Sequence, residues 1–146
     1  MGKRVLGLLA WVMAQRVGRA APPIAAGGEW FNTAPTSLEA LRGRVVLLNF
    51  WTFGCYNCDN SLPALRDYEK DAAKLRAAIA QKGITWPVVQ DNAYRTWRAY
   101  GNRCWPAFYL IDKQGTVRYL HAGEISGRYP KGIAALEAQL EKLLAE

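Results

Sequence analysis

The chain has 146 residues, 51% hydrophobic and 12% aromatic, which is enough apolar sequence for one globular domain with a sizeable core. Charged residues make up 21% and no stretch is repetitive, so the composition excludes a chain that is disordered throughout. The net charge is +7, but residues 1–20 hold four basic residues and no acid, and the other basic residues are interspersed with Glu and Asp. We therefore expect an ordinary solvated surface and no nucleic-acid partner.

The first 20 residues are typical of an export signal. Lys3 and Arg4 precede an apolar run from Val5 to Ala14, and Gly18-Arg19-Ala20 is a candidate cleavage site. The run is too short to cross the hydrocarbon core of about 30 Å as a stable helix. We predict a signal peptide or an N-terminal anchor over residues 1–20, a Pro/Gly-containing linker over 21–29 and one domain over 30–146. An apolar cytosolic leader is the alternative.

The first half of the predicted domain contains two strands. Trp30-Phe31 is expected to begin the domain as a short edge strand, and Thr36 and Glu39 have the spacing of a helix capping box, with Gly43 ending that helix. Val45 to Trp51 is almost unbroken apolar sequence. Such a run predicts a strand covered on both faces in the middle of a mostly parallel sheet.

The second half alternates helical and strand patterns. We predict a helix that begins at a cysteine pair, a helix through Ala72–Ile79 stopped by Gly83, a strand at Pro87–Gln90 and a helix over Asn92–Tyr100. Asp112–Gly115 is a good hairpin turn between strands 107–111 and 116–121, and leucines at helical spacing continue to Leu144. The order predicts an α/β sandwich.

The residues that carry chemistry are Cys55 and Cys58, which follow the apolar strand at the start of a helix. A helix N-terminus presents unpaired N–H groups and the positive end of the dipole, so the pKa of the Cys55 thiol should fall below about 8.5. Cys55 would attack a disulfide, and Cys58, one turn deeper, would resolve the mixed disulfide. The spacing closes too short a loop for a structural staple.

A zinc site or a covalently attached haem fits the sequence less well than redox chemistry. A zinc site needs four ligands, and the chain offers this pair, the distant Cys104 and the single histidine His121. Covalent haem attachment needs histidine directly after the second cysteine, where Asp59 stands. We therefore expect no metal and no cofactor beyond a redox-active Cys55–Cys58 disulfide.

Two longer motifs resemble a known family. The segment 51–58, Trp-Thr-Phe-Gly-Cys-Tyr-Asn-Cys, followed by Leu62-Pro63, resembles the active-site segment of exported thioredoxin-like redoxins of the TlpA and DipZ type. Residues 91–102 with Trp105-Pro106-Ala107, and the stretch 41–46, resemble the DipZ-type domain closely. The resemblance covers most of residues 30–146. It implies a thioredoxin-like three-layer sandwich, with a central mixed sheet flanked by helices, and a periplasmic or other extracytoplasmic location.

The resemblance also implies which residues support the cysteines. Pro106 is expected to be cis and to lie beside the pair, which would leave the backbone of Trp105 free to bind a peptide. Trp51 and Trp105 are candidates for the walls of a substrate groove, and a plain core role is an equal alternative. The remaining candidate support residues are Thr52, Tyr56, Asn57 and Glu124.

The chain departs from the family pattern in the segment after the cysteine helix. A further strand normally follows that helix, but here Tyr68 to Ala72 passes from one helical pattern into the next. Our hypothesis is that Trp86–Gln90 takes the place of the missing strand beside Val45–Trp51, with a right-handed crossover.

Three polar side chains near the predicted site are also unusual. Asn49 stands where thioredoxins carry a buried acid, and since an amide cannot shuttle a proton, water or Glu124 would have to serve Cys58. A solvated surface role for Glu124 is the commoner one. Cys104 could form a disulfide with Cys55, but a lone cysteine is more often a small buried apolar residue.

The predicted function is thiol–disulfide exchange, in the reducing direction, on exported protein disulfides, with electrons from a membrane-bound donor. A peroxidase of peroxiredoxin type is one alternative, because Thr52 stands three residues before Cys55, although Leu48 occupies the place of that pattern's proline. A non-catalytic thioredoxin-fold adaptor or metallochaperone is another, with few sulfur and imidazole ligands to support it.

Overall fold

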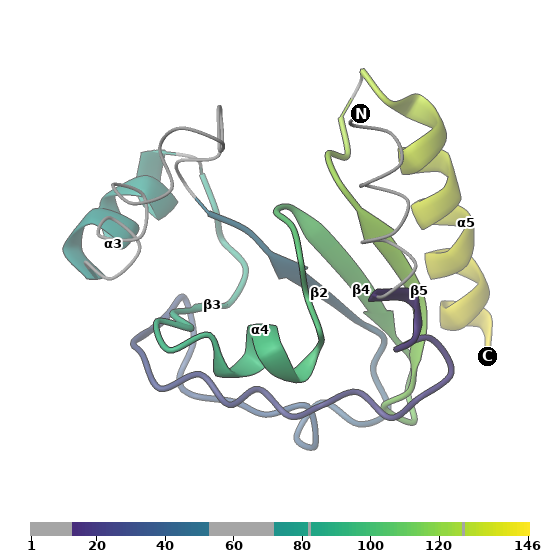
Figure 1. Ribbon diagram of the computed structural model, residues 1–146, viewed down its shortest axis with the longest axis horizontal. Coiled ribbons are helices and arrows are strands. Elements are labelled where there is room, and N and C mark those ends of the chain that lie inside the picture. The colour runs from purple at the N-terminus through teal and green to yellow at the C-terminus, as the bar shows by residue number, and fades with distance from the viewer. Residues whose placement is uncertain (1–12, 53–71, 82, 127) are drawn as a thin grey trace.

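The computed structural model describes residues 13–52, 72–81, 83–126 and 128–146. In chain order its elements are β1 (Trp30–Phe31), β2 (Val46–Phe50), α3 (Ala72–Gln81), β3 (Val88–Val89), α4 (Arg95–Ala99), β4 (Ala107–Ile111), β5 (Val117–Ala122) and α5 (Pro130–Ala145). Figure 1 shows α5 lying along β5, with α3 on the opposite side of the view. Among these described residues, no helix has both the length and the apolar character to cross a bilayer.

The larger sheet has the strand order β2–β4–β5, and both of its pairs are antiparallel. The hairpin between β4 and β5 confirms the predicted turn: the Gly115 amide donates to the Asp112 carbonyl over 3.0 Å, and Gly115 has a φ of 85°. Val46, Leu48 and Phe50 of β2 pack against the larger core, whereas Trp51, which follows β2, packs against a smaller one. Leu47, on the other face of β2, is 46% exposed, so the predicted cover on both faces is found only in part.

The smaller sheet corrects the hypothesis about the missing strand. Val88–Val89 pairs antiparallel with Trp30–Phe31, so Trp86–Gln90 does not pair with Val45–Trp51. Within the described residues β2 is an edge strand with one antiparallel neighbour, not the middle of a parallel sheet. A close approach at Gly28 brings β3 beside β1. The Gly28 amide donates to the Gln90 carbonyl, and the Gln90 amide donates to the Glu29 carbonyl.

The helices agree with the sequence patterns in part. Helix α3 ends before Gly83, which has a φ of 63°, as predicted. Helix α4 begins at Arg95 rather than Asn92, because Tyr94 is left-handed and the Asp91 carboxylate caps the amides of Thr96 and Trp97.

The capping box predicted at Thr36 and Glu39 is wrong. Residues 38–43 form turns instead of a helix, and the Ser37 hydroxyl accepts from the Ala40 amide. The turns close through i→i−3 bonds such as Leu41 N–H to Leu38 C=O, so one favourable local cap is not extended into a helix.

Residues 13–29, predicted as the end of a leader and a linker, lie against the domain. Met13 is fully buried in the larger core, and the amides of Gly18 and Ala21 donate to the carbonyls of Val117 and Gly115. Further along, the Ala25 amide donates to the Thr96 hydroxyl over 3.1 Å. The segment therefore contributes to folding, and cleavage near residue 20 stays a prediction.

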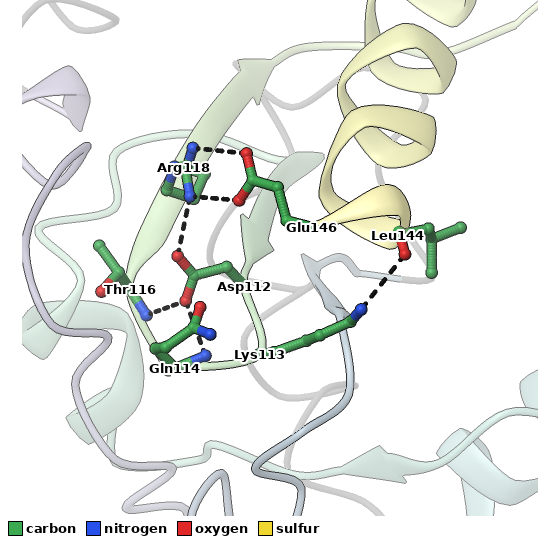
Figure 2. Close-up of polar contacts among 7 residues, drawn as sticks. All are labelled: Asp112, Lys113, Gln114, Thr116, Arg118, Leu144 and Glu146. Atoms are coloured by element: carbon green, nitrogen blue, oxygen red, sulfur yellow. Dashed lines mark hydrogen bonds and ion pairs between the residues drawn. The ribbon is translucent and has the colours of Figure 1, made fainter.

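A polar cluster joins the C-terminus to the β4–β5 turn (Figure 2). Arg118 bridges two carboxylates: its Nη1 lies 3.1 Å from Oδ2 of Asp112 and 2.8 Å from Oε2 of Glu146. Burial alone would raise the pKa of Asp112, but hydrogen bonds from the amides of Thr116 and Gln114 and from Arg118 outweigh it and lower that pKa. The β4–β5 turn and Glu146, which follows α5, are thus held by the same guanidinium group.

Candidate active site

The end of β2 and the start of β4 bring the predicted support residues together. Phe50 is paired with Ala107, so Trp51 and Thr52 leave the sheet beside the peptide bond that joins Trp105 to Pro106. That peptide bond is cis, as the resemblance implied. Trp51, Thr52 and Trp105 also line one hollow of about 850 Å³.

The end of β5 closes the same corner of the sheet. The Gly123 amide donates to the Pro106 carbonyl over 2.9 Å, which places Glu124 next to the proline loop. Glu124 is exposed, and its carbonyl lies 3.4 Å from Nε2 of His121. Exposure agrees with a solvated surface role for Glu124; proton transfer to Cys58 stays a prediction.

Four of the predicted residues fall outside the described ones, namely Cys55, Tyr56, Asn57 and Cys58. The described chain stops at Thr52 on that side and resumes at Ala72.

A buried hydrogen-bond chain fixes the loop before Pro106. The Tyr109 hydroxyl donates to Oδ1 of Asn102 over 3.0 Å, and Nδ2 of Asn102 donates to the Cys104 carbonyl over 3.1 Å. Tyr109 is fully buried and Asn102 is 1% exposed. Burial raises the pKa of Tyr109 well above its ordinary value, so its hydroxyl stays protonated and can donate. Sequence reasoning assigned neither residue a role.

Cys104 has the character of a buried apolar side chain. It is half-buried, packs against the larger core, and its sulfur lies 3.9 Å from the Pro106 carbonyl. Burial raises the pKa of the Cys104 thiol, which disfavours the reactive thiolate. These contacts agree with the commoner of the two predicted roles, and a bond to Cys55 involves a residue outside the described part.

Aromatic rings pack against the loop that contains Trp105 and Pro106. Trp97 of α4 lies against Trp105, with ring centroids 4.7 Å apart, and Phe50 makes edge-on contacts with Trp97, Tyr100 and Tyr109. Trp51 and Trp105 are both half-buried, so each has a packed face and also lines the hollow. Trp97 is a support residue that the sequence analysis missed, although its spacing from Trp105 within one aromatic-rich motif was a usable signal.

Two buried polar atoms near the site have no partner among the described residues. They are Oδ1 of Asn49 and Oγ1 of Thr52. Both residues line the hollow. Because a buried oxygen without a hydrogen bond costs about 1–3 kcal/mol, such atoms mark a place where a ligand or another segment can supply a donor.

The fold and this corner of the sheet define a thioredoxin-like domain. A solved structure of a thioredoxin-like superfamily protein, SPOA0173, superposes with a TM-score of 0.68 at 26% identity, over 87% of this chain and 97% of that one. The predicted α/β thioredoxin-like class is confirmed.

The chain belongs to the AhpC/TSA family, whose model matches residues 17–120. Protein DipZ of Mycobacterium bovis is 39% identical over 119 residues, covering 65% of this chain and 17% of that protein. Thiol-disulfide oxidoreductase YkuV of Bacillus subtilis is 23% identical over 145 residues, covering 86% of this chain and 94% of that one. The chain thus spans about a sixth of the length of DipZ but nearly all of YkuV.

Proposed function

We propose that the chain is a thiol–disulfide oxidoreductase that reduces protein disulfides outside the cytoplasm through Cys55 and Cys58. The observation that carries the proposal is the meeting of the β2 end with the cis proline loop, since Cys55 follows Thr52 by three residues. The proposal is that Cys55, three positions after Thr52 in the sequence, acts at this corner of the sheet.

In the proposed reaction the Cys55 thiolate attacks one sulfur of a substrate disulfide. A Cys55–substrate disulfide forms and the other substrate sulfur leaves as a thiolate, which takes a proton from water. The Cys58 thiolate then attacks the Cys55 sulfur, releasing the second substrate thiolate and leaving a Cys55–Cys58 disulfide. A dithiol donor must reduce that disulfide again, and a membrane-bound protein partner fits the proposed location.

The names of the relatives support the chemistry. YkuV and ResA of Geobacillus thermodenitrificans are both called thiol-disulfide oxidoreductases, and a structural neighbour from Chlorobium tepidum is described as a putative thiol:disulfide interchange protein DsbE. The location outside the cytoplasm rests on the export-like pattern of residues 1–20. Tyr56 and Asn57, between the cysteines, are proposed to face the substrate.

Cysteine variants test the proposal in an assay of insulin disulfide reduction. Cys55→Ser should lower the rate by at least about a thousandfold, because it removes the nucleophile. Cys58→Ser should instead accumulate a mixed disulfide with the substrate that is visible by mass, because it removes the resolving thiol.

Cys104→Ser is the matched control and should keep the insulin rate within about twofold, since the Cys104 thiol is half-buried and its pKa is raised. Equal rates for Cys55→Ser and the unmodified chain would contradict the proposal. Turnover of hydrogen peroxide faster than that of insulin would favour the peroxidase alternative instead.

A further inference from the structure

Two carbonyl groups of the proline loop, residues 103–106, are held by hydrogen bonds from outside the loop. The Pro106 carbonyl accepts from the Gly123 amide over 2.9 Å, and the Cys104 carbonyl accepts from Nδ2 of Asn102 over 3.1 Å. The first bond joins two backbone groups, whereas the second depends on the side chain at position 102. The identity of residue 102 therefore bears directly on the conformation of the loop.

The hydrogen bonds leave the amide of Asn102 one orientation. A carbonyl group can only accept, so the amide nitrogen must face Cys104 and the amide oxygen must face Tyr109. The Tyr109 hydroxyl donates to that oxygen over 3.0 Å. Because burial raises the pKa of Tyr109, the hydroxyl keeps the proton that it donates. Tyr109 thus holds the amide in the orientation that the Cys104 carbonyl requires.

The backbone of Asn102 connects it to the aromatic ring beside Trp105. The Asn102 amide nitrogen of the main chain donates to the Trp97 carbonyl over 3.0 Å. The rings of Trp97 and Trp105 pack together with their centroids 4.7 Å apart. Asn102 is therefore linked to Trp105 in two ways, through the Cys104 carbonyl just before it and through the ring of Trp97.

Both polar side chains lie on the core side of the proline loop. Tyr109 is fully buried in the larger core and Asn102 is 1% exposed, so neither is placed to touch a bound molecule. Replacing both members of a buried hydrogen-bonded pair by apolar groups of similar shape can be nearly neutral for stability. Stability alone therefore does not require an amide and a hydroxyl here, and what the pair adds is a defined direction for the Cys104 carbonyl.

We propose that Asn102, oriented by Tyr109, is a positioning residue that holds the proline loop and Trp105 in the conformation that binds the substrate polypeptide beside its disulfide. This inference rests on the proposed function, which brings that disulfide to the corner of the sheet where β2 ends. Since the amide acts only through the loop, its loss should weaken the binding of substrate more than it slows thiol–disulfide exchange.

The first test is the kinetics of insulin reduction by Asn102→Leu, which removes both hydrogen bonds at nearly constant volume. KM for insulin should rise at least about tenfold and kcat should stay within about twofold, because contacts of the loop with the polypeptide stabilise ground state and transition state alike. A structural role alone would reduce the folded fraction, which lowers kcat and leaves KM unchanged. That result would overturn the proposal.

Tyr109→Phe tests whether Tyr109 acts through Asn102. Alone it should raise KM about threefold, since the amide can still donate to Cys104, and in the Asn102→Leu background it should change KM less than about 1.5-fold. The double variant also leaves no buried hydroxyl or amide without a partner, so it tests the loss of the amide even if Asn102→Leu does not fold. Effects on KM that multiply in the double variant would contradict the proposed order of action.

A spectroscopic measurement tests the position of Trp105 without any redox activity. Two indole rings this close give an exciton couplet in the far-UV circular dichroism, and Trp105→Phe defines the couplet of the Trp97–Trp105 pair by difference. Asn102→Leu should reduce that couplet at least about twofold, because the ring of Trp105 is no longer held beside Trp97. An unchanged couplet would overturn the proposal.

Asp112→Ala is the matched control for lost stability. Asp112 is 6% exposed at the opposite end of β4 from the proline loop, and its carboxylate accepts from the amides of Gln114 and Thr116. The variant should be less stable but keep the couplet and KM within about 1.5-fold, since distant sites act independently. If the unmodified chain does not reduce insulin while Asn102→Leu still loses the couplet, the proposed function fails and the positioning of Trp105 by Asn102 stands.

Discussion

Replacing Met13 with Ala is expected to lower the free energy of unfolding by about 2–5 kcal/mol, although Met13 lies within 20 residues of the N-terminus. The side chain is fully buried in the larger core with Leu38, Tyr100 and Tyr109. Its removal leaves a cavity that the β4–β5 hairpin, held by paired backbone, can fill only in part. Urea unfolding of the full chain, followed by Trp emission, measures the change.

Val17→Ala is the control for Met13→Ala. Val17 belongs to the same N-terminal segment but is 43% exposed, so its truncation should cost less than about 0.5 kcal/mol. Equal stability of Met13→Ala and Val17→Ala would show that residues 13–25 do not pack on the domain in solution. Removal of residues 1–20 should destabilise the domain at least as much as Met13→Ala, because the backbone bond from Gly18 to Val117 is also lost.

Gly28→Ala is expected to destabilise the chain by about 1–3 kcal/mol, the usual cost of forcing extra volume into a packed contact. A Cβ atom on Gly28 would lie 2.5 Å from Cβ of Gln90 and 2.6 Å from its carbonyl oxygen. The conflict is with backbone, so it can be relieved only by moving β3 away from β1. The hollow beside the candidate active site should change with it, since Gln90 and Trp30 line that hollow.

Gly27→Ala provides a neighbouring control. The nearest atoms to a Cβ there belong to the Arg95 guanidinium group, at 3.8 Å or more, which is ordinary contact. Thermal unfolding should therefore give a Tm for Gly27→Ala close to that of the unmodified chain and a lower Tm for Gly28→Ala. Equal Tm values for the two variants would contradict the pairing of β1 with β3 as described.

Local patterns in the sequence were sufficient to predict much of the α/β fold. The strand 107–111, the Asp112–Gly115 turn and the end of α3 at Gly83 follow from periodicity and turn residues, and the structure confirms them. The start of α4 differed because the Asp91 carboxylate caps amides five and six residues later. A cap at that distance depends on the left-handed Tyr94, which sequence periodicity does not indicate.

Apart from the β4–β5 hairpin, the strand partners could not be predicted. The run 45–51 predicts a strand covered on both faces, but Leu47 is 46% exposed, and Trp51 meets a different core from Val46, Leu48 and Phe50. The pairing of Val88–Val89 with Trp30–Phe31 depends on the contact between Gly28 and Gln90, which are 62 positions apart in the chain. Of the candidate site, the cis Pro106 came from the family resemblance, whereas the support from Asn102 and Tyr109 required the tertiary structure.

Cys55 and Cys58 are proposed to form a reversible redox couple, and its reduction potential can be measured directly. The purified chain is equilibrated in glutathione buffers of graded ratio, and its free thiols are trapped with an alkylating agent. The mass of the products gives the oxidised fraction at each ratio, and these fractions give the reduction potential. We expect one Cys55–Cys58 disulfide with a potential near that of thioredoxin, about −270 mV, as suits a reductase. A potential near −120 mV would make the protein an oxidant and contradict the proposed direction. If no Cys55–Cys58 disulfide forms at any ratio, the redox assignment itself is wrong.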